Sequence, residues 1–195
     1  MGLLMISLKL FYKHFFTILI FCSSVLGQNE NFVGKEAPTF YLLDINGKDF
    51  FLSQEIDKPI LINFFATWCG PCIKELSDLK DFGQKHDGKI KIILIDESNM
   101  SALPEQKPSK DALIKFLKKE NVEFDVLLDK YAIVAEKYNI TETIYNKKDK
   151  KEYLIARLPA TYLIDENGII LWEKREMFTQ SDLYNLEKDF DEIFK

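Results

Sequence analysis

The stretch from residue 60 to residue 72 constrains the fold of this chain more than any other. It reads Ile-Leu-Ile-Asn-Phe-Phe-Ala-Thr-Trp-Cys-Gly-Pro-Cys, an apolar run of strand length that ends in two cysteines with two residues between them. Apolar residues at helical spacing follow, at Ile73, Leu76, Leu79 and Phe82. The stretch therefore predicts a buried strand that leads directly into a helix, with a Cys-x-x-Cys motif where the helix begins.

A cysteine pair at the start of a helix favours redox chemistry, because the helix dipole and the unpaired backbone N–H groups stabilise a thiolate. Cys69 precedes the turn and can be exposed, whereas Cys72 lies one turn inside and can close a disulfide with it. Gly70 frees the turn sterically, and Pro71 suits the first helical position because it has no N–H to leave unpaired. We predict that Cys69 is the attacking thiol and Cys72 the resolving thiol of a thiol–disulfide exchange.

Two other uses of the cysteine pair fit the sequence less well. A structural zinc site needs about four ligands, and beyond the pair the chain has only Cys22, His14 and His86. Cys22 and His14 lie in an N-terminal segment that we expect to be removed. An inert structural disulfide over so short a loop would restrict the unfolded chain little. We therefore expect a redox-active disulfide, with no metal and no cofactor.

The N-terminus predicts export. Two basic residues, Lys9 and Lys13, precede an apolar run over residues 15–27. A charged region before an apolar core is the plan of a secretory signal, and this run is shorter than the roughly 20 residues of a membrane-spanning helix. We predict a signal peptide at residues 1–27 and a mature protein in the periplasm or on the outer face of the cytoplasmic membrane. An uncleaved N-terminal anchor and lipidation at Cys22 stay open as alternatives.

The remaining residues, 28–195, have the length of one ordinary domain. The whole chain is 47% hydrophobic and 29% charged, which is enough apolar sequence for a core. Its net charge of −5 does not favour a nucleic-acid partner. Apolar runs at 89–95 and 122–128 predict further buried strands, and helical patterns begin near Ser109 and Ser181.

The segment Phe-Phe-Ala-Thr-Trp-Cys-Gly-Pro-Cys at 64–72 resembles the active-site motif of the thioredoxin superfamily. Asn63 makes the resemblance one to TlpA/ResA-type extracytoplasmic thiol–disulfide oxidoreductases, because cytosolic thioredoxins usually have a buried Asp there. The Ala-Pro-x-Phe opening at 37–40 is similar to these proteins and to peroxiredoxins, which need a Thr where this chain has Ala66. The resemblance implies a thioredoxin fold, an α/β fold with a central mixed sheet flanked by helices and an N-terminal β-hairpin extension.

The resemblance also adds residues to the predicted site. The stretch 157–165 is similar to the superfamily's cis-proline segment, which implies that Leu158 and Pro159 form the floor of a substrate groove beside the cysteines. In ResA-like proteins a Glu at the position of Glu75 lies beside the cysteines and tunes their protonation; the alternative is a solvated surface residue. Trp68 either shields the thiolate and contacts substrate or only packs against the sheet.

The chain departs from the family between Tyr138 and Pro159, where it takes 21 residues over a connection that is usually much shorter. Two β-prone pieces at about 141–156 flank a polar Asn-Lys-Lys-Asp-Lys-Lys turn, which predicts a protruding hairpin inserted before the cis-proline strand. Because this insertion enters at the proline loop, it either shapes partner choice beside Cys69 or is a surface insertion without function.

The predicted function is extracytoplasmic thiol–disulfide exchange, reducing the disulfides of other exported proteins. The resemblance suggests cytochrome c maturation as one setting, and a reductase of this kind needs a membrane electron donor. A disulfide oxidase or isomerase, and a non-catalytic module that binds cysteine-containing partners, stay open as alternatives. We expect a monomer whose partners are exported proteins.

Overall fold

The apolar run before the two cysteines forms strand β3 (Ile60–Phe65), all of whose residues are buried. It lies between β4 (Lys91–Asp96), which is parallel to it, and β8 (Ala160–Ile164), which is antiparallel. The computed structural model describes residues 31–101 and 103–194, so the signal peptide predicted at residues 1–27 lies outside the described residues.

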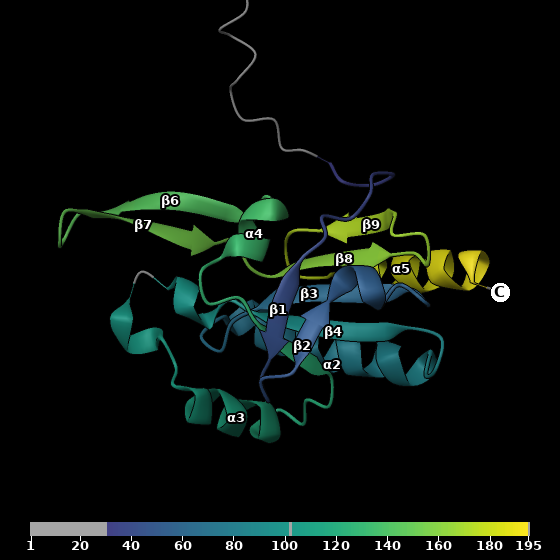
Figure 1. The fold of residues 1–195 in the computed structure, drawn as a ribbon, viewed down its shortest axis with the longest axis horizontal. Coiled ribbons are helices and arrows are strands. Elements are labelled where there is room, and N and C mark those ends of the chain that lie inside the picture. The colour runs from purple at the N-terminus through teal and green to yellow at the C-terminus, as the bar shows by residue number, and fades with distance from the viewer. Residues whose placement is uncertain (1–30, 102, 195) are drawn as a thin grey trace, which may run out of the picture. The chain divides into compact units, whose positions relative to one another are not determined.

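These strands belong to a seven-stranded mixed sheet with the order β2-β1-β5-β4-β3-β8-β9 (Figure 1). Its other members are β1 (Tyr41–Asp44), β2 (Asp49–Phe51), β5 (Asp125–Leu128) and β9 (Ile170–Lys174). Strands β1 and β2 pair as the predicted N-terminal hairpin, and β1 also pairs with β5. The hairpin turns at Gly47, whose φ of 88° is a conformation that favours glycine.

Alternate residues of β3 point to opposite faces of the sheet, as the period of a strand requires. On one face, Leu61 and Phe65 join a core formed with α2 (Gly70–Lys85), α3 (Lys110–Lys119) and α5 (Gln180–Ile193). On the other face, Ile62 and Phe64 pack with α4 (Ile133–Lys137) and the N-terminal segment from Phe32 to Phe40. Figure 1 shows α4 above the sheet and α2 and α3 below it, which is the predicted sheet flanked by helices.

The ends of two helices show how their caps decide where they begin. Helix α3 starts directly after Ser109, whose hydroxyl accepts the backbone N–H of Ala112 at 3.2 Å, as the pattern predicted. Helix α5 starts after Thr179 rather than at Ser181, because the side chains of Thr179 and Asp182 accept each other's backbone N–H groups in a capping box.

The insertion forms the hairpin that the sequence predicted. Strands β6 (Thr141–Asn146) and β7 (Lys151–Ala156) make a two-stranded antiparallel sheet that is separate from the main sheet and projects from it (Figure 1). None of the helices in the described part of the chain has the length and apolar character needed to cross a membrane.

Candidate active site

The redox pair lies where β3 ends and α2 begins. Cys69 is the N-cap of α2, and its Sγ accepts the backbone N–H of Cys72 at 3.2 Å. The two sulfur atoms are joined in a disulfide. Pro71 is the second residue of α2, one position later than predicted, and still lies in the first turn, where a missing N–H leaves no intrahelical hydrogen bond unmade. The positive end of the helix therefore acts on the sulfur of Cys69, where it favours the thiolate once the disulfide is reduced.

Both cysteines are more enclosed than the sequence suggested. Cys69 is 6% exposed and Cys72 is 1% exposed, and both belong to the core on the α2 face of the sheet. Cys69 is still the more accessible of the two sulfur-bearing residues, so it keeps its predicted role as the attacking thiol. In this disulfide form Cys69 is largely covered, because packing from the surrounding core reaches the first residue of the turn.

The loop between β3 and Cys69 is tied to the neighbouring strand. Ser98, just beyond β4, accepts the backbone N–H of Thr67 at 2.9 Å through its hydroxyl, and its own hydroxyl donates to Asp96. The indole N–H of Trp68 donates to the backbone carbonyl of Ser98 at 2.9 Å, and the half-buried ring packs against the core that holds both cysteines. Packing is therefore one established role of Trp68, and substrate contact stays a prediction.

Glu75 is buried, so the alternative of a solvated surface residue is wrong. It is 1% exposed and lies one turn after Cys72 on the inner face of α2. One carboxylate oxygen accepts the side-chain amide of Asn63 at 3.0 Å, and the other accepts the backbone N–H of Phe178 at 3.0 Å. The Asn63 amide also donates to the hydroxyl of Thr161 at 2.8 Å, across the β3–β8 pair.

The environment of Glu75 suits a proton carrier. Burial raises the pKa of Glu75 from its ordinary 4.5 to about 7, although the donors Phe178 and Asn63 act in the opposite direction. A carboxyl group with a pKa near neutrality can both accept and release a proton under physiological conditions. The raised pKa is compatible with the predicted influence of Glu75 on the protonation of the cysteines, and that role stays a prediction.

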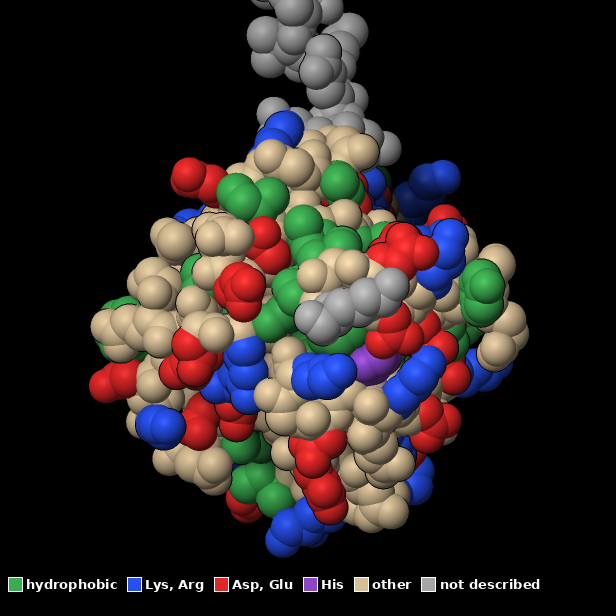
Figure 2. Space-filling model, turned by 90° about the vertical axis from the view of Figure 1, so that its right-hand side faces the viewer, with side chains coloured by type: hydrophobic (Ala, Val, Ile, Leu, Met, Phe, Trp, Pro, Cys, Tyr) green, Lys and Arg blue, Asp and Glu red, His purple; other side chains and the backbone are tan. Residues whose placement is uncertain are grey.

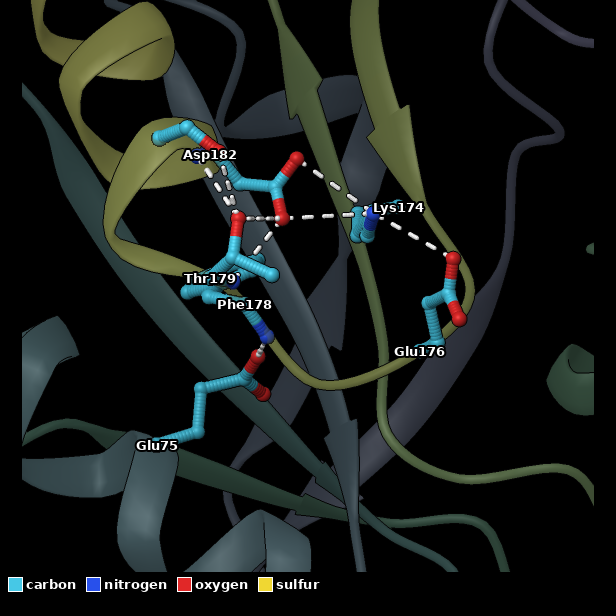
Figure 3. A network of polar contacts seen from close by, with 7 residues as sticks. Glu75, Lys174, Glu176, Phe178, Thr179 and Asp182 are labelled. Atoms are coloured by element: carbon cyan, nitrogen blue, oxygen red, sulfur yellow. Dashed lines mark hydrogen bonds and ion pairs between the residues drawn. The ribbon is translucent and has the colours of Figure 1, made fainter.

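Phe178 connects Glu75 to a polar network at the start of α5 (Figure 3). Next to it, Thr179 and Asp182 form the capping box, and Asp182 accepts from the Lys174 ammonium at 3.2 Å. Lys174 also pairs with Glu176 at 3.2 Å. These contacts fix the short segment between β9 and α5, and with it the N–H that faces Glu75. Sequence reasoning missed Phe178 because a backbone donor leaves no signal in the sequence.

Glu97 is a second buried acid beside the loop, and the sequence analysis did not single it out. It is fully buried, and the carboxyl group of Asp129 lies beside it. Burial, followed by the nearby Asp129 and Asp96 carboxylates, raises the pKa of Glu97 to about 10, so it stays protonated at neutral pH. In the described residues, no three His, Cys, Asp or Glu side chains are grouped so that they could hold a metal ion.

The predicted proline loop lies at the same end of the sheet as the cysteines. The Leu158–Pro159 bond is cis, as the resemblance implied. Ala160 pairs with Phe64 near the end of β3, and Leu158 packs against both cores, including the one that contains Cys69 and Cys72. Leu158 thus packs against the same core as the redox pair, and its place in a substrate groove over this loop stays a prediction.

Comparison with known proteins agrees with this geometry. The sequence model described as the AhpC/TSA family matches residues 33–173. The chain belongs to the AhpC/TSA family. It is 30% identical over 156 residues to the thiol-disulfide oxidoreductase ResA of Bacillus subtilis (strain 168), which is 78% of this chain and 72% of that protein. It is 28% identical over 152 residues to ResA of Bacillus thuringiensis subsp. konkukian, covering 77% of this chain and 74% of the relative.

A solved structure of a thiol:disulfide interchange protein DsbE from Chlorobium tepidum superposes on this family member with a TM-score of 0.65. The identity is 21%, over 84% of this chain and 98% of that one, so this likeness bears on the fold. The predicted thioredoxin-type fold and the ResA resemblance are both confirmed. With the Cys69–Cys72 disulfide, the ResA relatives also confirm the prediction of a thiol–disulfide oxidoreductase.

Proposed function

We propose that this oxidoreductase works outside the cytoplasm and reduces disulfide bonds in other exported proteins. The observation that carries the proposal is the Cys69–Cys72 pair at the N-terminus of α2, next to a buried carboxyl group that can titrate near neutral pH. The two residues between the cysteines are Gly and Pro, the pair found in reducing thioredoxins. The basic and apolar N-terminal sequence supports export.

The reduction runs through two exchanges. The Cys69 thiolate attacks one sulfur of the substrate disulfide; a Cys69–substrate disulfide forms, and the other substrate sulfur leaves and is protonated. The Cys72 thiol then loses its proton to Glu75 and attacks the Cys69 sulfur. The bond between Cys69 and the substrate breaks, the Cys69–Cys72 disulfide closes, and the second substrate sulfur leaves as a thiolate and is protonated. Two electrons pass from the protein to the substrate, and the protein is left in the oxidised form seen here.

This cycle requires a partner that returns the two electrons. We propose that a membrane-bound thiol donor reduces the Cys69–Cys72 disulfide by the same exchange in reverse order, and that the protein acts as a monomer. Apocytochrome c, whose haem-attachment cysteines must be reduced, is one candidate substrate among exported proteins. Retention at the membrane through an uncleaved N-terminus is compatible with such a donor, and cleavage after residue 27 leaves a free periplasmic protein.

The midpoint potential of the Cys69–Cys72 pair tests the direction of electron flow. The protein is equilibrated in buffers of defined thiol-to-disulfide ratio, and the free thiols are counted after alkylation. We expect a value near that of thioredoxin, about −270 mV, as a reductase requires. A value above about −180 mV would instead assign the protein to oxidases and isomerases.

A further inference from the structure

We propose that the β6–β7 hairpin is a docking arm for an acidic, extended segment of the substrate protein, next to the disulfide that Cys69 attacks. The inference rests on the proposed function and adds the class of substrate to it. Four properties of the hairpin carry it: its attachment to the redox site, its free strand edges, the charge of its tip and its length.

The base of the hairpin leads into the proline loop, at the end of the sheet where the redox pair lies. Strand β7 ends at Ala156, and Leu158, which packs against the core of the two cysteines, follows two residues later. Arg157 lies between them; its backbone N–H donates to the carbonyl of Ile140 at 2.7 Å and its guanidinium to the carbonyl of Asn139 at 2.9 Å. These bonds hold the two ends of the hairpin together, so its direction from the proline loop is set.

Neither outer edge of the hairpin pairs with another strand in the described residues, although β7 also contacts the short helix Ser98–Met100. In the part of the chain that the structure describes, β6 and β7 pair with each other and with no other strand. An open edge presents backbone N–H and C=O groups to which an extended peptide can add as a further strand. On one face, the cross-strand pairs Thr143–Leu154 and Tyr145–Glu152 follow one another. Tyr145 is 58% exposed and Leu154 is 37% exposed, so an added segment would meet apolar surface there.

The tip of the hairpin concentrates positive charge. Four lysines lie within five residues, interrupted only by Asp149, and within the described residues none of them forms an ion pair: Lys147, Lys148, Lys150 and Lys151. The turn itself is ordered, because Asn146 accepts the backbone N–H groups of Lys148 and Lys150 and Asp149 accepts the hydroxyl of Tyr153.

This concentration contrasts with the rest of an acidic protein. The whole chain has a net charge of −5, whereas the five tip residues sum to +3. On the side of the molecule where α5 ends, Figure 2 shows acidic and basic side chains intermixed. A local positive charge on a negative protein attracts an acidic segment more strongly than a neutral one, and salt screens this attraction.

The length of the arm sets where the acidic residues should lie in the substrate. Each strand has six residues, and a strand rises about 3.3 Å per residue, so the tip lies about 20 Å from the base. An extended segment whose cysteine reacts at the base reaches the tip after roughly six residues. The arm therefore fits substrates with Asp or Glu about five to eight residues from the target cysteine.

Two disulfide-bonded peptides test the proposal. They share one sequence around the disulfide and carry either four Asp or four Gln residues centred seven positions from the reacting cysteine. The full-length reduced protein is mixed with each, and the second-order rate constant for reduction is measured at low and high salt. The tip variant has Lys147, Lys148, Lys150 and Lys151 changed to Glu. The control has the same change of charge at exposed lysines in or near α3: Lys107, Lys110, Lys115 and Lys118.

We expect wild type and control to reduce the acidic peptide at least tenfold faster than the neutral one at low salt, with the ratio falling as salt rises. In the tip variant the ratio should fall to one or below. Equal ratios in wild type and tip variant overturn the arm. If the ratio of the two rates is the same in wild type and tip variant, and only wild type binds anionic phospholipid vesicles, the lysines would be assigned to a membrane surface, which also overturns the arm. Failure of wild type to reduce either peptide or a small aromatic disulfide would instead refute the proposed function itself.

Discussion

The loop that carries Cys69 and the β6–β7 hairpin both lead toward the Leu158–Pro159 loop, but they differ in burial. The residues around the cysteines are packed into the core, whereas the hairpin is largely exposed. Around the loop, Cys72 and Glu75 are each 1% exposed, and both carboxylate oxygens of Glu75 have a donor. In the hairpin, the tip lysines are exposed and the outer strand edges are unpaired within the described residues. The reaction thus depends on positions that packing fixes, whereas the surface offered to a partner lies on an element outside the core.

Among substitutions in these two regions, the largest effect on activity is expected at Cys72. In Cys72→Ser the first exchange can still occur, but no thiol remains to resolve it, so catalytic turnover should be lost and Cys69 should accumulate as a mixed disulfide with substrate. Non-reducing gel electrophoresis and mass spectrometry would detect the adduct. Cys69→Ser is the matched control, which should form no adduct; adducts in both variants, or in neither, would contradict the assigned roles.

Because Glu75 is buried, it should make the free energy of unfolding depend on pH, whereas the exposed charges of the hairpin should not. Its pKa is raised by burial from 4.5 to about 7, so the folded state favours the protonated form. The stability due to this group is fully present below pH 4.5 and is lost as the pH rises through 7, by about 3 kcal/mol in total. Buried Asp96 and Glu97, whose pKa values are also raised, cause a loss of stability over the same range in both proteins, so urea denaturation from pH 4 to pH 8 should show a loss about 3 kcal/mol larger in wild type than in Glu75→Gln.

Glu105→Gln, at an exposed position, is the control for this experiment and should follow the wild-type profile. An identical slope in wild type and Glu75→Gln would mean that Glu75 does not titrate in this range.

Asn63→Ala should destabilise the core by a smaller amount. The change removes a donor to Glu75 and to Thr161, leaving buried acceptors without that partner, at a cost of about 1–3 kcal/mol. The pKa of Glu75 should rise further, because the Asn63 donor lowers it. Denaturation at pH 5 and pH 8 measures both effects. Asn46→Ala, in the exposed β1–β2 turn, is the control, and an equal loss in the two variants would argue against a special role for Asn63.

The smallest effect is expected from removing the hairpin. Deleting residues 142–154 joins Thr141 to Ile155, which removes all the cross-strand pairs of the hairpin and leaves a short turn between Ile140 and Arg157. Because the hairpin forms its own sheet, the free energy of unfolding should change by about 1 kcal/mol or less, as for a shortened surface loop. If the free energy of unfolding fell by more than about 3 kcal/mol, the core would depend on the hairpin, and the hairpin could not be regarded as an element outside the core. Thermal and urea denaturation provide the measurement.

The elements that position the redox pair could be predicted because periodicity changes abruptly along the chain. A continuous apolar run gives way to helical spacing at Cys69, and a second run starts after Pro159. The hairpin was equally visible, as two β-prone pieces around a lysine-rich turn. These features depend on local sequence, so local patterns predict them.

Features that depend on contacts between distant residues could not be predicted in the same way. Glu97 follows a strand, where an acid is usually solvated, and only the packing around it makes it buried and protonated. The donor from Phe178 to Glu75 joins residues 103 positions apart through a backbone group. The sequence places the start of α5 at Ser181, one residue too late, because Thr179 and Ser181 are both suitable N-cap residues. The reciprocal capping by Thr179 and Asp182 selects Thr179.

The open edges of the hairpin also bear on how copies of this protein behave together in solution. Two such edges from different molecules can pair with each other, which is a route to aggregation. Four lysines at the tip oppose this pairing, because like charges repel as two hairpins approach side by side. The lysines that we assign to docking should therefore also oppose edge-to-edge pairing between molecules.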